Sequence, residues 1–100
     1  ADPTFAATAT SMFARPPYEI DAAHPLPGLL GAAAKDAGCR AETIGMSFWT
    51  DAAVLGGAGI PTVLFGPAGA GLHSTDEWVD LASVRQCRDA LAATIRAWCR

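Results

Sequence analysis

Apolar residues follow two kinds of spacing along the chain, and the change of spacing predicts the order of its elements. Helical spacing occurs over 25–37 and 80–98, where apolar side chains fall on one face. A short apolar helix is predicted over 51–58. It lies between two short apolar runs, 43–46 and 60–65, that are typical of strands. Strand, helix and strand in this order predict a compact βαβ unit with a right-handed crossover.

Residues at the ends of the two longer segments support this interpretation. Pro25 suits the first turn of a helix, and Gly38 can close that helix in the left-handed conformation. Asp80 can cap the last helix and favours the positive end of its dipole. His24, directly before Pro25, is either a capping or surface residue or a metal ligand, and no residue near it has ligand spacing.

The first part of the chain has a different pattern. Residues Thr4–Phe13 are rich in Thr and Ala and alternate weakly, which predicts a strand. Arg15–Tyr18 contains two consecutive prolines, which end a strand because proline donates no ladder hydrogen bond. We therefore place the linker of the chain at Arg15–Tyr18.

Composition shows an excess of apolar side chains for so short a chain. The chain has 100 residues, which suffices for one small domain. Hydrophobic residues make up 51% and charged residues 17%, and the mean hydropathy is +0.23. A small domain has little interior. The excess predicts apolar surface that meets a partner or chain lying outside this sequence.

Charge and cysteine content exclude several function classes. The net charge is −3 without a basic stripe, so nucleic-acid binding has no electrostatic support. No apolar run approaches the ~20 residues of a membrane span, and the first residues lack the basic start of a signal peptide. Cys39, Cys87 and Cys99 lack the close pairing of structural zinc sites, so we expect free thiols in a reducing, cytoplasmic location.

A glycine-rich loop after the run 60–65 carries the most informative histidine, His73. Gly66, Gly69 and Gly71 allow the backbone to approach a ligand closely. Histidine is the commonest metal ligand and the usual acid or base near neutral pH. The alternative is an ordinary loop histidine that bonds to backbone.

The residues behind His73 predict a helix start. Ser74 and Glu77 match the Ser-x-x-Glu capping box, in which both side chains bond to backbone amides. Asp76 and Glu77 are neighbours, and neighbouring residues on a helix do not face each other. We therefore interpret this pair as structural rather than as two catalytic acids.

Two further positions offer chemistry. Ser47 lies in a near match to the nucleophile elbow Gly-x-Ser-x-Gly, but Trp49 stands where the tight turn needs glycine. Thr50 and Asp51 open the short helix. They and the His73 loop follow predicted parallel strands, so both should emerge at the ligand-binding edge of one sheet. The alternative for Thr50 and Asp51 is helix capping.

Four blocks together resemble a known family. They are FWTDAA at 48–53, GIPT at 59–62, FGP at 65–67 and HSTDEWV at 73–79. Their order and spacing resemble the C-terminal part of the zinc metallohydrolase family that contains acetylornithine deacetylase, succinyl-diaminopimelate desuccinylase, aminoacylase and glutamate carboxypeptidase. Arg15–Tyr18 also resembles the exit of that family's lid domain, and the resemblance covers roughly residues 13–100.

The resemblance implies an α/β fold, a three-layer α/β/α catalytic domain with a smaller lid. Residues 1–20 would end the lid with its last strand and linker, and 21–100 would form the C-terminal part of the catalytic domain. It implies two zinc ions, with His73 as the last metal ligand. It also implies a substrate-binding set. That set is Thr50, Asp51, Gly66, Gly69 and Gly71.

The reaction implied is hydrolysis of the amide of an N-acyl amino acid or small peptide next to a free carboxylate. The sequence departs from the family because it contains no His-x-Asp motif and no Glu-Glu pair. A catalytic zinc ion needs about three protein ligands, so we expect the other ligands and the base in a preceding part of the protein, and no activity from this chain alone. A homodimer is left open. The rivals are a non-catalytic α/β interaction module or degenerate paralogue, and a serine hydrolase using Ser47.

Overall fold

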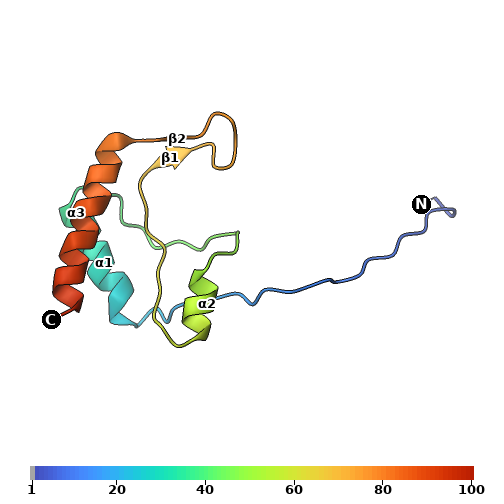
Figure 1. Ribbon diagram of the computed structural model, residues 1–100, viewed down its shortest axis with the longest axis horizontal. Helices are drawn as coiled ribbons and strands as arrows, with labels where there is room; N and C mark the ends of the chain where they lie inside the picture. The colour runs from blue at the N-terminus through green and yellow to red at the C-terminus, as the bar shows by residue number, and fades with distance from the viewer. Residues whose placement is uncertain (1) are drawn as a thin grey trace.

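The computed structural model describes residues 2–100, which contain three helices and one small sheet (Figure 1). Residue 1, the first of the predicted unit 1–20, lies outside the described residues. In chain order the elements are α1 (Pro25–Asp36), α2 (Ala52–Gly57), β1 (Gly69–Ala70), β2 (Trp78–Val79) and α3 (Leu81–Trp98). No helix within 2–100 combines the length and apolar character needed to cross a membrane.

Helix α1 begins and ends where the sequence predicts. His24 has an extended backbone, and its Nδ1 accepts a hydrogen bond from the Leu26 amide at 3.2 Å. The helix closes at Gly38, whose φ of +83° is the left-handed conformation that favours glycine. The structure therefore supports the capping interpretation of His24.

Helix α3 is also confirmed. The Asp80 carboxylate accepts hydrogen bonds from the amides of Ala82 and Ser83, at 3.0 and 3.2 Å. Arg96 lies in the last turn, where its positive charge complements the helix dipole.

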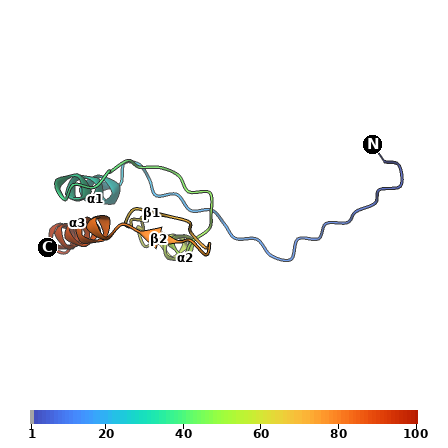
Figure 2. The same ribbon diagram turned by 90° about the horizontal axis from the view of Figure 1, so that it is seen from above.

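The core of the molecule is the contact between α1 and α3, which lie side by side (Figure 2). Small side chains bring the two backbones close together, since Ala34 and Ala90 are 1% and 0% exposed. Thr94 is buried as well, and its hydroxyl donates to the Ala90 carbonyl at 2.8 Å, which satisfies the polar group. Leu30 of α1 and Cys87 of α3 complete this contact.

The structure corrects the predicted strands. Thr4–Phe13, 43–46 and 60–65 are not strands, because the structure gives none of them a neighbouring ladder. A strand exists only where backbone amides and carbonyls pair with another strand. The sheet of the described residues is instead an antiparallel pair, β1 with β2. Helices with a small sheet are compatible with an α/β fold, but within 2–100 the βαβ unit and the three layers are not formed.

The chain is extended and leaves much apolar surface uncovered. Its radius of gyration is 18.6 Å, against about 13 Å for a compact domain of this length. Residues 2–17 form an exposed arm that runs away from the helices (Figure 1). Many large hydrophobic side chains are exposed, as the composition predicts. They include Phe5, Met12, Phe13, Ile44, Phe48, Val54, Ile60, Leu64, Leu72, Trp78, Leu81 and Ile95.

Candidate functional site

The candidate site is built on the β1–β2 hairpin, which is fastened to the start of α3. The Ala68 amide donates to the Ser83 hydroxyl at 2.9 Å, and the Asp80 amide donates to the Ala68 carbonyl at 2.8 Å. Gly69 pairs with Val79 and Ala70 with Trp78. The same first turn that caps α3 therefore holds the base of the hairpin.

Two glycines in the hairpin are required by its geometry. A Cβ at Gly69 would overlap the Trp78 carbonyl oxygen across the strand pair. Gly71 has φ +76°, and a Cβ there would lie 2.9 Å from both the Asp76 carbonyl oxygen and the Ser74 hydroxyl. The glycines thus allow the turn to fold tightly on itself, which explains part of the glycine-rich pattern.

His73 lies at the tip of this turn with its side chain exposed. Its φ is +64°, and among the described residues His73 is the only one other than glycine with a positive φ. A residue with a Cβ adopts this conformation uncommonly, and such residues gather at functional sites. The local fold therefore presents an imidazole to the surface from a tightly specified backbone.

The predicted capping box after His73 is wrong. No helix starts at Ser74 in the structure. The Ser74 hydroxyl accepts a hydrogen bond from the Asp76 amide at 3.3 Å, and the Ser74 amide donates to the Gly71 carbonyl at 2.8 Å. Serine makes the same local bonds in a turn as at a helix start. Here the chain turns back to form β2, so these bonds stabilise a turn and not a helix start.

Thr50 and Asp51 lie at the start of α2, as predicted, but in different roles. The Thr50 hydroxyl accepts a hydrogen bond from the Ala52 amide at 3.3 Å, so Thr50 caps the helix. The Asp51 side chain makes no capping bond and is exposed. Asp51 is therefore the freer of the two groups.

A contact that the sequence analysis missed lies beside Thr50. The Arg15 guanidinium carbon is 3.9 Å from the centre of the Trp49 ring. Within 2–100, Arg15 has no acidic partner close enough for an ion pair. The Trp49 Nε1 atom is buried without a hydrogen-bond acceptor in the described residues. In the sequence, only the aromatic residue next to Thr50 pointed to this contact, and no spacing rule links that residue to position 15.

The structure does not join the predicted site residues into one centre. The hairpin and α2 lie at opposite ends of the connection over 58–68 (Figure 1). No group of three or more His, Cys, Asp or Glu side chains in 2–100 is arranged to hold a metal ion. No hydrogen bond among the described residues links Ser47 to a histidine or an acid, so the serine-hydrolase alternative gains no support.

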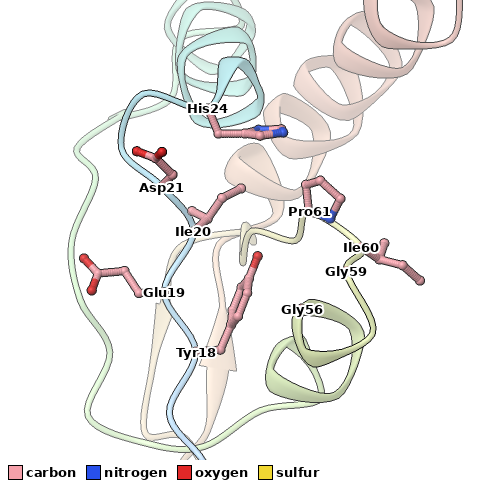
Figure 3. Close-up of a pocket in the computed structure, with 9 residues that line it drawn as sticks. All are labelled: Tyr18, Glu19, Ile20, Asp21, His24, Gly56, Gly59, Ile60 and Pro61. Atoms are coloured by element: carbon pink, nitrogen blue, oxygen red, sulfur yellow. The ribbon is translucent and has the colours of Figure 1, made fainter.

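Two cavities lie elsewhere on the surface. The first, about 180 Å³, is lined by Tyr18, His24, Gly56 and Pro61 among others (Figure 3). The Tyr18 hydroxyl accepts a hydrogen bond from the Thr62 amide at 3.0 Å, so this cavity lies where the end of the arm is bound to the connection that follows α2.

The second cavity, about 230 Å³, touches one predicted substrate-binding residue, Gly66. Arg40, Ser83 and Gln86 line it as well. Gln86 approaches the end of α1 closely, since a Cβ at Gly38 would lie 3.0 Å from its side-chain nitrogen. The cavity therefore lies where the Gly66 loop, the end of α1 and the start of α3 meet.

All three cysteines are free thiols, and the pKa of one of them, Cys87, is raised. Burial raises the pKa of the Cys87 thiol, and the neighbouring Cys39 adds to the effect. A buried neutral thiol is a weak nucleophile. Cys87 therefore belongs to the packing of α1 on α3.

Comparison with known proteins identifies the family. The family model described as Peptidase family M20/M25/M40 matches residues 6–97. No curated protein and no solved structure matches the chain. The matched range includes all four sequence blocks and the linker at Arg15–Tyr18. The chain therefore belongs to peptidase family M20/M25/M40.

Proposed function

We propose that the chain is the C-terminal segment of the catalytic domain of a zinc-dependent hydrolase that cleaves the amide of an N-acyl amino acid or small peptide. The observation that carries the proposal is His73, presented in the left-handed conformation at the tip of the hairpin. The family match over 6–97 supports a metallopeptidase or related hydrolase as the parent protein.

His73 fits one part of a zinc site. Its imidazole is exposed and stands on a turn that Gly69 and Gly71 make tight. One donor is fewer than the three or so protein ligands of a catalytic zinc ion, and the described residues supply no complete set. When bound, zinc activates water and stabilises negative charge on the carbonyl oxygen. In this proposal His73 supplies one ligand, and a preceding part of the protein supplies the others and the base.

The uncovered apolar surface supports an incomplete domain. The segments 43–46 and 60–65 lie outside the helices and the sheet, and both contain exposed apolar side chains. We propose that they pair with strands of the preceding part of the protein. That pairing would form the sheet whose edge unites Thr50 and Asp51 with the His73 loop.

The substrate side of the proposal uses Thr50, Asp51, Gly66, Gly69 and Gly71 together with one residue found in the structure. The substrate class carries a free carboxylate. Arg15 is an exposed cation without an ion-pair partner among residues 2–100, and it stacks on the ring beside Thr50. Its guanidinium suits a carboxylate because the two groups can form paired hydrogen bonds. We propose that Arg15 binds that carboxylate.

The test measures metal content and turnover of the full-length protein that contains this segment. His73→Ala should lower zinc affinity by at least ~100-fold, because even residues behind metal ligands cost 10- to 100-fold. Hydrolysis of N-acetyl amino acids should fall with it. His24→Ala is the matched control, since His24 caps α1, and it should change neither. Unchanged zinc content in His73→Ala would refute the ligand assignment.

The rival function is a non-catalytic interaction module, which the exposed apolar residues also support. The same preparation separates the two. A full-length protein that binds no zinc and hydrolyses no N-acyl amino acid or dipeptide would favour the interaction module. Activity that resists a chelator and is lost in Ser47→Ala would instead favour the serine hydrolase.

A further inference from the structure

The contact between Arg15 and Trp49 joins two segments that are far apart in the sequence. Arg15 belongs to the exposed arm, whereas Trp49 directly precedes Thr50 at the start of α2. The separation of 3.9 Å between the guanidinium carbon and the ring centre lies well inside the ~6 Å range of cation–π attraction. Phe13, a second aromatic residue on the arm, is 5.7 Å from the same carbon.

Trp49 engages Arg15 through the face of its ring and not through its polar atom. The indole nitrogen is buried and has no acceptor within 2–100. The side chain as a whole is half-buried, while Phe13 is 76% exposed. Trp49 therefore offers the better desolvated surface, on which a cation–π contact is stronger.

We infer that Trp49 is a positioning residue, which holds the Arg15 guanidinium beside Thr50 and Asp51 for the carboxylate of the substrate. The inference rests on the proposed function. Arginine is suited to this arrangement because a planar guanidinium can stack on a ring while its edge still donates hydrogen bonds. Trp49 is adjacent in sequence to Thr50, so the guanidinium and the Thr50–Asp51 loop are held by the same backbone.

The experiment compares two substrates of the zinc-loaded full-length protein. One is an N-acetyl amino acid with a free carboxylate, and the other carries a primary amide in its place. Trp49→Ala should lower kcat/KM for the acid by about 2- to 30-fold, the range that a cation–π contact represents, chiefly through KM. It should leave kcat/KM for the amide unchanged. Trp49→Phe keeps an aromatic face and should stay close to wild type.

Matched variants keep the test decisive. Phe13→Ala removes the more exposed ring, on which a cation–π contact is weaker, and should leave both substrates close to wild type. Arg15→Lys keeps the charge but lacks the planar group, so it should reproduce Trp49→Ala even where the latter fails to fold, as judged by circular dichroism. An equal loss for acid and amide, or an unchanged acid-to-amide ratio in Trp49→Ala and Arg15→Lys, would overturn the inference. A wild-type protein that hydrolyses neither substrate would instead refute the proposed function.

Discussion

The α1–α3 pair and the β1–β2 hairpin differ in what specifies their shape. The helix pair is packed through Leu30, Ala34 and Ala90, and its one buried hydroxyl, Thr94, is satisfied within α3. The hairpin has only exposed residues, yet its backbone is held by the first turn of α3 and by glycines with no room for a Cβ. Packing specifies the first region, and backbone geometry specifies the second.

This difference separates the region that stabilises the fold from the region that carries the candidate ligand His73. A packed helix pair tolerates little change in side-chain volume, but it contains none of the predicted site residues. The hairpin buries almost nothing, and it carries His73. Mutations in the helix pair should therefore change the free energy of unfolding, and mutations in the hairpin should change zinc affinity.

The largest effect on folding is expected from Leu30→Ala. Leu30 is 7% exposed in the contact of α1 with α3, and removing a buried leucine side chain costs about 2–5 kcal/mol. Urea denaturation followed by circular dichroism should show the midpoint moving to lower urea. Leu72→Ala is the control, because Leu72 is 61% exposed. Equal shifts in the two variants would show that the helix pair is not the core.

A smaller effect, at the other region, is expected from Gly69→Ala. The new Cβ would meet backbone, the Trp78 carbonyl, so β1 and β2 must separate. Such overpacking costs about 1–3 kcal/mol. Competition with a chelator should show weaker zinc binding by the full-length protein.

The matched control for Gly69→Ala is Gly45→Ala, where a Cβ would meet no atom within 4 Å. It should leave zinc affinity unchanged. If Gly69→Ala also bound zinc like wild type, the geometry of the hairpin would not govern the placement of His73.

The smallest effect is a pH dependence that belongs to the helix pair. The pKa of Cys87 is raised in the folded chain from its ordinary value of 9.0. The unfolded thiol therefore loses its proton at lower pH than the folded thiol, so the free energy of unfolding falls as pH rises above about 9. Below about pH 9 the thiol is protonated in both states, and its full contribution to the free energy of unfolding is present. Urea titrations should show a steeper alkaline decline in wild type than in Cys87→Ala. Cys99→Ala, at an exposed position, should keep the wild-type decline.

The parts of the fold that sequence could predict are those with local causes. The capping residues His24 and Asp80 and the terminating Gly38 act within one turn of their helices, and all three predictions are confirmed. The strands predicted over 43–46 and 60–65 need a neighbouring strand to pair with, and the pattern of apolar residues does not show whether one is present. The Ser74 prediction was wrong because one set of local bonds serves both a turn and a helix start.

The candidate site divides in the same way. His73 and the glycine-rich loop were found from residue type and order, and the family they indicate is confirmed over 6–97. Arg15 was missed because its neighbour Trp49 is a contact in space, which no spacing rule describes. The ligand role of His73 and the substrate roles of Thr50 and Asp51 stay predictions.

The packing of Tyr18 on Gly56 has a consequence for variation of the sequence. The Tyr18 ring occupies the space where a Cβ at position 56 would stand (Figure 3). The residues allowed at positions 18 and 56 therefore depend on each other. A Cβ at position 56 would force the Tyr18 ring to move away from α2, and a smaller residue at position 18 would remove the overlap.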